Sequence, residues 1–271
     1  TTDQMAALTS AQVKNLTTAQ FANLTTDQLT SISTASLMGI ATSQIAALTN
    51  DKLAAFTTLQ IGALSSAQAK SLTTTQISAM TTDQVVAFSN NQIKNLTTAQ
   101  ITALSTDQLV AIETSDLAAL TTAQVASITT AKLTALTTDQ VIALTTAQVK
   151  GFTTAQVAAL TSDQVIAIEN SDLAAMTTAQ IIALTTANVS NLTTGQISNL
   201  STAQAKSLTT AQLASLSTDQ LLSMRTAALA SLSTSQITSL TTDKLSSLTA
   251  AQIASLTTAQ VASITAGNIQ T

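Results

Sequence analysis

Apolar residues recur in this chain at two fixed positions of an eight-residue unit. Every residue whose number is a multiple of eight, from Leu8 to Ile264, is Leu, Ile, Met or Phe, and we call these residues anchors. A second apolar residue stands five positions after each anchor. These residues form a second column that runs from Met5 to Ile269. No insertion or deletion interrupts this spacing. The sequence therefore predicts one uninterrupted array over residues 1–271, and we expect it to be a piece of a longer array.

Each octad also carries a helix-start signal. Thr or Ser follows most anchors and Gln stands three residues later, as in Thr145 and Gln148. This pair is typical of a capping box, in which the hydroxyl and the Gln side chain satisfy the first free backbone amides of a helix. The two apolar residues have the spacing of the hydrophobic staple that accompanies such a cap. The pattern predicts one short helix in every eight residues.

Two other structures compete with this interpretation. A continuous α-helix would rotate each anchor by about 80° relative to the last, so no apolar stripe would form. A β-solenoid is favoured by the Thr, Val and Ile content, but the spacings of five and three do not alternate as a strand requires, and there are only 5 Gly for its corners. A single octad would gain about 3–6 kcal/mol from two buried aliphatic side chains and lose about 12 kcal/mol in ordering. We therefore expect an all-α solenoid of stacked short helices, with a β-solenoid as the alternative.

Rare residues show a longer period. Asp stands three residues after the anchor at Asp27, Asp51, Asp83, Asp107, Asp139 and Asp163, in steps of three, four, three, four and three octads. An alternation of three and four indicates about 3.5 units per turn, as in a heptad seam. The spacing predicts a superhelix with about 3.5 octads, or 28 residues, per coil, with both apolar columns along the axis and stripes of Asp and Lys outside. The alternative is a duplicated 56-residue block without geometric meaning.

The composition excludes much chemistry. The chain has no Cys, His, Trp, Tyr or Pro, and 8% of its residues are charged. Disulfides, ordinary zinc or haem sites and thiol or imidazole catalysis are therefore not expected. Nine basic residues against thirteen acidic ones make a nucleic-acid surface unexpected. No apolar run approaches the ~20 residues of a membrane span. We expect no enzyme activity, no cofactor, and no catalytic or metal site.

Two pairs of acids are the nearest approach to a metal site. Glu113 with Asp116, and Glu169 with Asp172, lie three residues apart where the Thr cap is missing. Such pairs attract cations such as calcium, but two carboxylates fall short of the six to eight oxygens that calcium takes. We interpret them as acids that replace the lost Thr cap at the start of a helix.

Two family resemblances follow from the octads. The segment from Met80 to Phe88, MTTDQVVAF, resembles the start of the first helix of TAL-effector DNA-binding repeats. The second helix, the Gly pair and the base-reading loop of those repeats are missing, so DNA binding does not carry over. Over its whole length the chain resembles the LTTxQ-type octapeptide arrays of very large bacterial secreted or surface proteins, which implies a structural or adhesive stalk.

These observations favour a structural role. We expect a rigid rod or a self-assembling filament, outside the cell or on a bacterial surface, whose partner is a second copy of itself. The alternative is a binding module whose Thr-rich polar face holds a glycan, ice or a protein.

Overall fold

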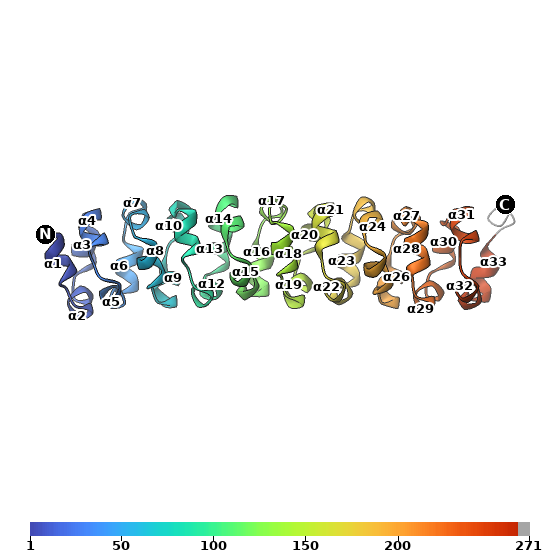
Figure 1. Ribbon diagram of the computed structural model, residues 1–271, viewed down its shortest axis with the longest axis horizontal. Coiled ribbons are helices and arrows are strands. Elements are labelled where there is room, and N and C mark those ends of the chain that lie inside the picture. The colour runs from blue at the N-terminus through green and yellow to red at the C-terminus, as the bar shows by residue number, and fades with distance from the viewer. Residues whose placement is uncertain (265–271) are drawn as a thin grey trace. The chain divides into compact units, whose positions relative to one another are not determined.

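The structure is a computed structural model that describes residues 1–264 of the chain (Figure 1). Over this range it contains 33 α-helices of four to six residues and no strand. The predicted all-α solenoid with one short helix per octad is therefore confirmed, and the β-solenoid alternative is wrong. Within the described range, no helix has the length and apolar character needed to cross a membrane.

The chain divides into two compact units, Thr1–Leu136 and Thr137–Thr271. The single uninterrupted array over residues 1–271 stays a prediction. Unit 1 contains α1 (Thr2–Ala6), α2 (Ser10–Lys14), α3 (Thr18–Ala22), α4 (Thr26–Thr30), α5 (Thr34–Leu37), α6 (Thr42–Ala46), α7 (Asn50–Ala54), α8 (Thr58–Gly62), α9 (Ser66–Ser71), α10 (Thr74–Ala79), α11 (Thr82–Val86), α12 (Asn90–Asn95), α13 (Thr98–Ala103), α14 (Thr106–Ala111), α15 (Thr114–Ala119), α16 (Thr122–Ser127) and α17 (Thr130–Leu133).

The described part of unit 2 has the same organisation. It contains α18 (Thr138–Ile142), α19 (Thr146–Lys150), α20 (Thr154–Ala159), α21 (Ser162–Ala167), α22 (Asn170–Ala175), α23 (Thr178–Ala183), α24 (Thr186–Asn191), α25 (Thr194–Ser198), α26 (Thr202–Ser207), α27 (Thr210–Ser215), α28 (Thr218–Ser223), α29 (Thr226–Ala230), α30 (Thr234–Thr238), α31 (Thr242–Ser246), α32 (Ala250–Ser255) and α33 (Thr258–Ser263).

The capping box starts the helices as the sequence predicts. At α13, the Thr97 hydroxyl accepts from the backbone amide of Gln100 at 3.2 Å, and the Gln100 side chain accepts from the Thr97 amide at 2.8 Å. The helix ends at its next anchor, Leu104, where the backbone is extended again (φ −54°, ψ 138°). No described residue has a positive φ. The chain therefore turns every corner with extended backbone that any residue adopts, which explains how it manages with so few Gly.

The two acidic caps differ from the prediction. Glu113 and Glu169 stand at the N-cap positions of α15 and α22, and neither side chain makes a cap hydrogen bond. The expectation that these acids replace the Thr cap is wrong. Good N-caps carry their oxygen on a short side chain that bends back to the N2 or N3 amide, and Glu is too long for that geometry.

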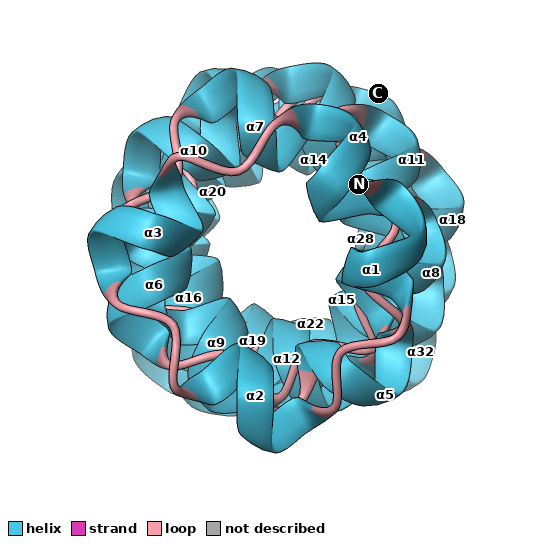
Figure 2. Cartoon of the chain, turned by 90° about the vertical axis from the view of Figure 1, so that its left-hand side faces the viewer, coloured by secondary structure: helices cyan, strands magenta, loops and turns pink. Residues whose placement is uncertain are grey.

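Successive helices wind into a coil of about 3.5 octads. Helix contacts recur between neighbours three apart, such as α9 with α12 in unit 1 and α19 with α22 in unit 2. Hydrogen bonds join helices four apart, as when Gln92 in α12 donates to the carbonyl of Ile61 in α8. Figure 2 shows the helices of unit 1 around a ring, with α1 and α8, and α4 and α11, near the same place on it. The predicted superhelix is confirmed in each unit.

The core of each coil consists of the two apolar columns. Leu104 and Leu109 are both 0% exposed, and even the small members of the second column, Ala69 and Ala205, are fully buried. The three residues after each anchor are mostly exposed. The two columns therefore form the buried core of each unit. Their predicted position along the axis of the coil stays a prediction.

Candidate functional site: a glutamine ladder and its substitutions

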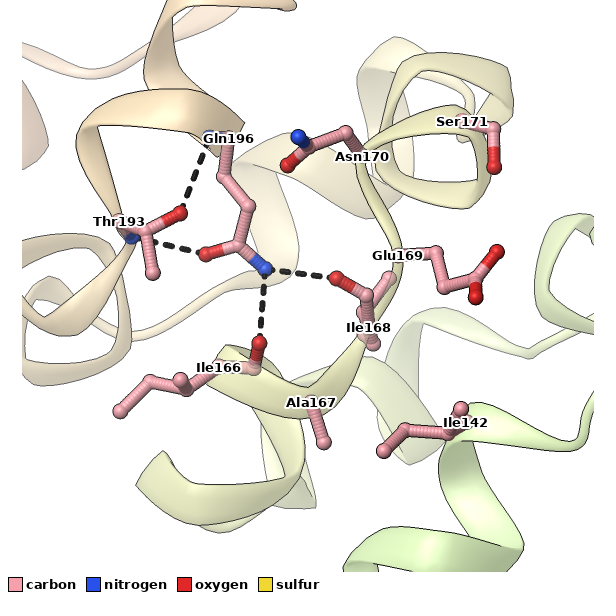
Figure 3. Close-up of a pocket in the computed structure, with 9 residues that line it drawn as sticks. All are labelled: Ile142, Ile166, Ala167, Ile168, Glu169, Asn170, Ser171, Thr193 and Gln196. Carbon is pink, nitrogen blue, oxygen red and sulfur yellow. Dashed lines mark hydrogen bonds between the residues drawn. The ribbon is translucent and has the colours of Figure 1, made fainter.

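The Gln of the capping box has a second partner that its sequence position does not reveal. Figure 3 shows Gln196 as an example. Its side-chain oxygen accepts from the Thr193 amide at 2.8 Å, while its Nε2 donates to the Ile168 carbonyl at 2.8 Å and the Ile166 carbonyl at 3.3 Å. Those carbonyls belong to the preceding coil. One buried amide thus caps its own helix and binds the coil beside it.

The same bond repeats along both units, and we call it the ladder. In each case Nε2 donates to a carbonyl 28 residues back at 2.5–3.1 Å. In unit 1 the donors are Gln44, Gln60, Gln68, Gln76, Gln84, Gln92, Gln100, Gln108 and Gln124. In unit 2 they include Gln180, Gln196, Gln204, Gln212, Gln220, Gln236, Gln252 and Gln260.

A sequence signal for the ladder exists, and the capping interpretation missed it. The fourth residue after the anchor, which we call the ladder position, is Gln in 25 of the 34 octads and never Glu. A capping box accepts Glu as readily as Gln, because both supply the required oxygen. Only Gln also carries a donor. The complete absence of Glu therefore indicates that the side chain has to donate as well as accept.

Most substitutions at the ladder position keep a donor. Lys52, Lys132 and Lys244 each donate from Nζ to a carbonyl 30 residues back, at 2.6 Å for Lys132 and 2.5 Å for Lys244. Asn188 donates to a carbonyl 28 residues back at 2.8 Å, and Ser36 does so at 2.6 Å. Lys52, Lys132 and Lys244 are half-buried, whereas the Lys residues of the predicted stripes are exposed.

Asp116 and Asp172 also stand at the ladder position, and an ionised Asp side chain has no hydrogen-bond donor. Asp172 is stabilised from the preceding coil, where the Thr146 hydroxyl donates to its Oδ1 at 2.6 Å. Asp116 Oδ1 is buried, and it is the only such side-chain atom of the described residues without a hydrogen-bond partner. Burial, and secondarily the nearby Glu113 carboxylate, raise the pKa of Asp116. The structure thus separates two acids that the sequence pattern makes equivalent.

The Asp and Lys residues of the predicted stripes lie on two opposite arcs of unit 1. Asp27, Asp51, Asp83 and Asp107 are exposed and belong to α4, α7, α11 and α14, while the exposed Lys14, Lys70 and Lys94 belong to α2, α9 and α12. Figure 2 places the first four helices on one side of the ring and the other three on the opposite side. The predicted stripes are confirmed for this unit, and the 3,4 alternation has the geometric meaning inferred for it.

Unit 2 has an open groove of about 530 Å³ beside α22 (Figure 3). Ile142 and Ile166 contribute apolar surface to it, and they are 46% and 44% exposed. Glu169 and Asn170 add polar groups. The groove offers a shallow apolar contact surface. Among the described residues, no three His, Cys, Asp or Glu side chains form a group able to hold a metal ion.

Comparison with known proteins agrees with the octad architecture. The sequence model of the ALTTAQ repeat matches residues 1–34, 53–90, 82–111, 109–146, 142–167 and 165–202. These segments together cover more than half of the chain. No match was found among curated proteins.

Proposed function

We propose that this chain, which belongs to the ALTTAQ repeat family, is a rigid spacer segment of a bacterial extracellular or cell-surface protein, without catalytic activity. That it is a structural repeat protein follows from the family and the fold. The observation that supports a rigid spacer is the ladder. It joins each coil to the next with the same buried hydrogen bonds in both units.

Rigidity follows from where these bonds lie. In many solenoids, neighbouring repeats are held by side-chain packing across their interface. Here each Gln adds a bond of defined direction between backbone and side chain, and each such bond contributes about 0.5–1.5 kcal/mol. Gln100 makes three such contacts at 2.7–3.2 Å and is 2% exposed. Bending between coils would stretch these bonds on one side, so the ladder resists it.

The extracellular location is supported by the absence of oxidisable thiols and by the resemblance to secreted arrays. Without Cys, the chain has no group that an oxidising environment would cross-link. Antibodies raised against the chain should label intact, unpermeabilised cells of the source organism. Labelling only after permeabilisation would contradict this part of the proposal.

Small-angle scattering of the purified chain tests the spacer. If all 271 residues form the proposed straight rod, it holds nearly ten coils of 28 residues. Packed helices lie about 8–10 Å apart, so that rod would be about 75–100 Å long. A rod of that length has a radius of gyration of at least about 22–28 Å, against about 18 Å for a compact globule of this size. A value near the globular figure would refute the rigid spacer.

Self-association is the second part of the proposal, and the charged arcs of unit 1 support it. Asp lies on one side and Lys on the opposite side, so the acidic arc of one copy faces the basic arc of another when copies lie side by side. Such exposed pairs contribute little singly and are screened by salt. Sedimentation velocity should therefore show concentration-dependent association at 20 mM salt that disappears at 500 mM. Association unchanged by salt would contradict a role for the arcs.

A binding module remains the second candidate, and the groove beside α22 favours it. Its exposed Ile142 and Ile166 would contact an apolar ligand. Replacing both by Ser, which stands at the same place of several other octads, should abolish binding of such a ligand while leaving the helical circular dichroism unchanged.

A further inference from the structure

We propose that unit 2 binds the unit 2 of a second copy of this chain through two strips of its outer surface, the acidic strip of one copy against the basic strip of the next. The inference rests on the self-association proposed above, and it adds an apolar contact and a second surface to it. The acidic strip consists of Asp139, Ile142, Asp163, Ile166 and Glu169, and the basic strip consists of Lys150, Ile182 and Lys206.

The acidic strip joins helices of neighbouring coils. Helices α18 and α21 contact each other, and each carries an exposed Asp and, three residues later, an exposed Ile. Side chains three residues apart lie on the same face of a helix, so charge and apolar surface lie together here. Ile142 and Ile166 line the groove beside α22, and Glu169 lines it with them (Figure 3). The strip is therefore an apolar surface accompanied by acids.

Glu169 supports a role for this surface outside its own helix. It stands where most octads have a Thr or Ser cap, and its side chain makes no cap hydrogen bond. Losing an N-cap hydrogen bond destabilises a helix, so α22 gains nothing from having Glu at this position. The exposed carboxylate instead brings a negative charge to the groove, where a cationic partner would meet it.

The basic strip crosses three helices that are joined to one another. Gln180 of α23 donates to the Lys150 carbonyl of α19 at 3.2 Å, and α23 also contacts α26. Lys150, Ile182 and Lys206 belong to α19, α23 and α26, they stand at the same position of their octads, and all three are exposed. Here too an aliphatic side chain accompanies charges, which are now positive.

The exposed Ile side chains set the two strips apart from the rest of unit 2. Their octad position is Ala, Ser or Thr in the other octads of this unit up to residue 264, except for the two Lys and the half-buried Leu222. The three Ile are 44–48% exposed. Single exposed aliphatic residues are ordinary, whereas exposed apolar surface that gathers in one place marks a site of interaction. A partner with matching charge would cover these side chains.

A second copy of the chain is the partner that the charges select. Its Lys residues oppose the Asp and Glu residues of the acidic strip, and its Ile182 supplies apolar surface to the groove. The strips face different directions on one unit, because α23 follows α18 by five octads, or about one and a half turns at about 3.5 octads per coil. A contact between two different surfaces does not close into a dimer. Copies therefore add to one another side by side.

Sedimentation velocity of the whole chain at low salt tests the proposal with two variants. The acidic-strip variant carries Ile142→Ser and Ile166→Ser, and the basic-strip variant carries Ile182→Ser. Ser stands at this octad position in Ser190 and Ser198, so both variants should fold. Each alone should associate about tenfold more weakly than the original chain, or less still, because apolar contact is lost. An equal mixture should form one-to-one complexes, since each variant keeps the strip that the other lacks.

Leu59→Ala is the matched control. Leu59 is 77% exposed in unit 1, it lies outside both strips, and Ala stands at its octad position in Ala67 and Ala99. This variant should associate like the original chain, and equal weakening by it would overturn the strips. They would also be overturned if either Ile variant associated like the original chain, or if the mixture associated no better than its components. In those cases salt-dependent association through unit 1 would still stand, whereas an original chain that stays monomeric up to its solubility limit would refute both proposals.

Discussion

The substitution Gln100→Glu isolates the donor function of the ladder from its capping function. Glu keeps an oxygen for the Thr97 amide, which Gln100 now accepts at 2.8 Å. It replaces Nε2 by a second oxygen that faces the carbonyls of Ala69 at 3.1 Å and Leu72 at 2.7 Å. The helix cap therefore survives while the bond between coils becomes a repulsion.

The cost follows from the burial of the site. Two lost hydrogen bonds account for about 1–3 kcal/mol, and an uncompensated charge on a side chain that is 2% exposed adds to that, as in broken buried ion pairs that cost about 3–5 kcal/mol. We expect a local destabilisation of about 3–5 kcal/mol at pH 7, which corresponds to a loss of about 100-fold or more in exchange protection. The penalty should disappear below about pH 4, where the Glu is protonated in both folded and unfolded chains.

Hydrogen exchange by mass spectrometry is the suitable assay, because long repeat arrays do not unfold in a single cooperative step. Protection should fall in α13, which contains Gln100, and in α9, which contains the acceptor Ala69. It should stay unchanged several coils away. Gln20→Glu is the matched control, since Gln20 is exposed and its side chain bonds only to Thr17 within its own cap. Equal effects of the two substitutions would refute the ladder as the source of stability.

Three further predictions follow from the same geometry. Thr153→Ala should lower the local free energy of unfolding at α20, measured by hydrogen exchange, by about 1 kcal/mol through loss of the N-cap hydroxyl. Thr154→Ala, one residue further on, should change that free energy by less than about 0.5 kcal/mol. The raised pKa of Asp116 should make stability fall as pH rises above the ordinary carboxyl value of 3.8, and urea melts of Asp116→Gln should lack that part of the pH dependence. Inserting a complete octad before Leu208 should leave the melting temperature nearly unchanged, while a four-residue insertion there, which displaces the ladder from its carbonyls, should lower it clearly.

Local structure was predictable because its determinants lie within one octad. A Thr hydroxyl, a Gln three residues later and two apolar side chains specify where a helix such as α13 begins and ends. The coil was predictable for a different reason. Asp27, Asp51 and Asp83 recur in steps of three and then four octads, and a winding of about 3.5 octads brings such an alternation to one side of unit 1.

The candidate sites were less predictable. The Glu caps were expected from charge alone, but at Glu113 side-chain length decides the outcome. The groove beside α22 depends on which apolar residues stay exposed, as Ile166 does, and octad position alone did not indicate this.

The sequence by itself determined the octad, its short capped helix and the 28-residue winding, since each of these depends on the repetition of local patterns. Only the tertiary structure decided what the side-chain nitrogen of the buried Gln binds, because its acceptor carbonyls lie 28 and 31 residues back in the preceding coil. The same holds for Asp116 and Asp172. Their local sequences are nearly alike, but the Thr146 hydroxyl of the preceding coil donates to Asp172, whereas Asp116 Oδ1 has no hydrogen-bond partner.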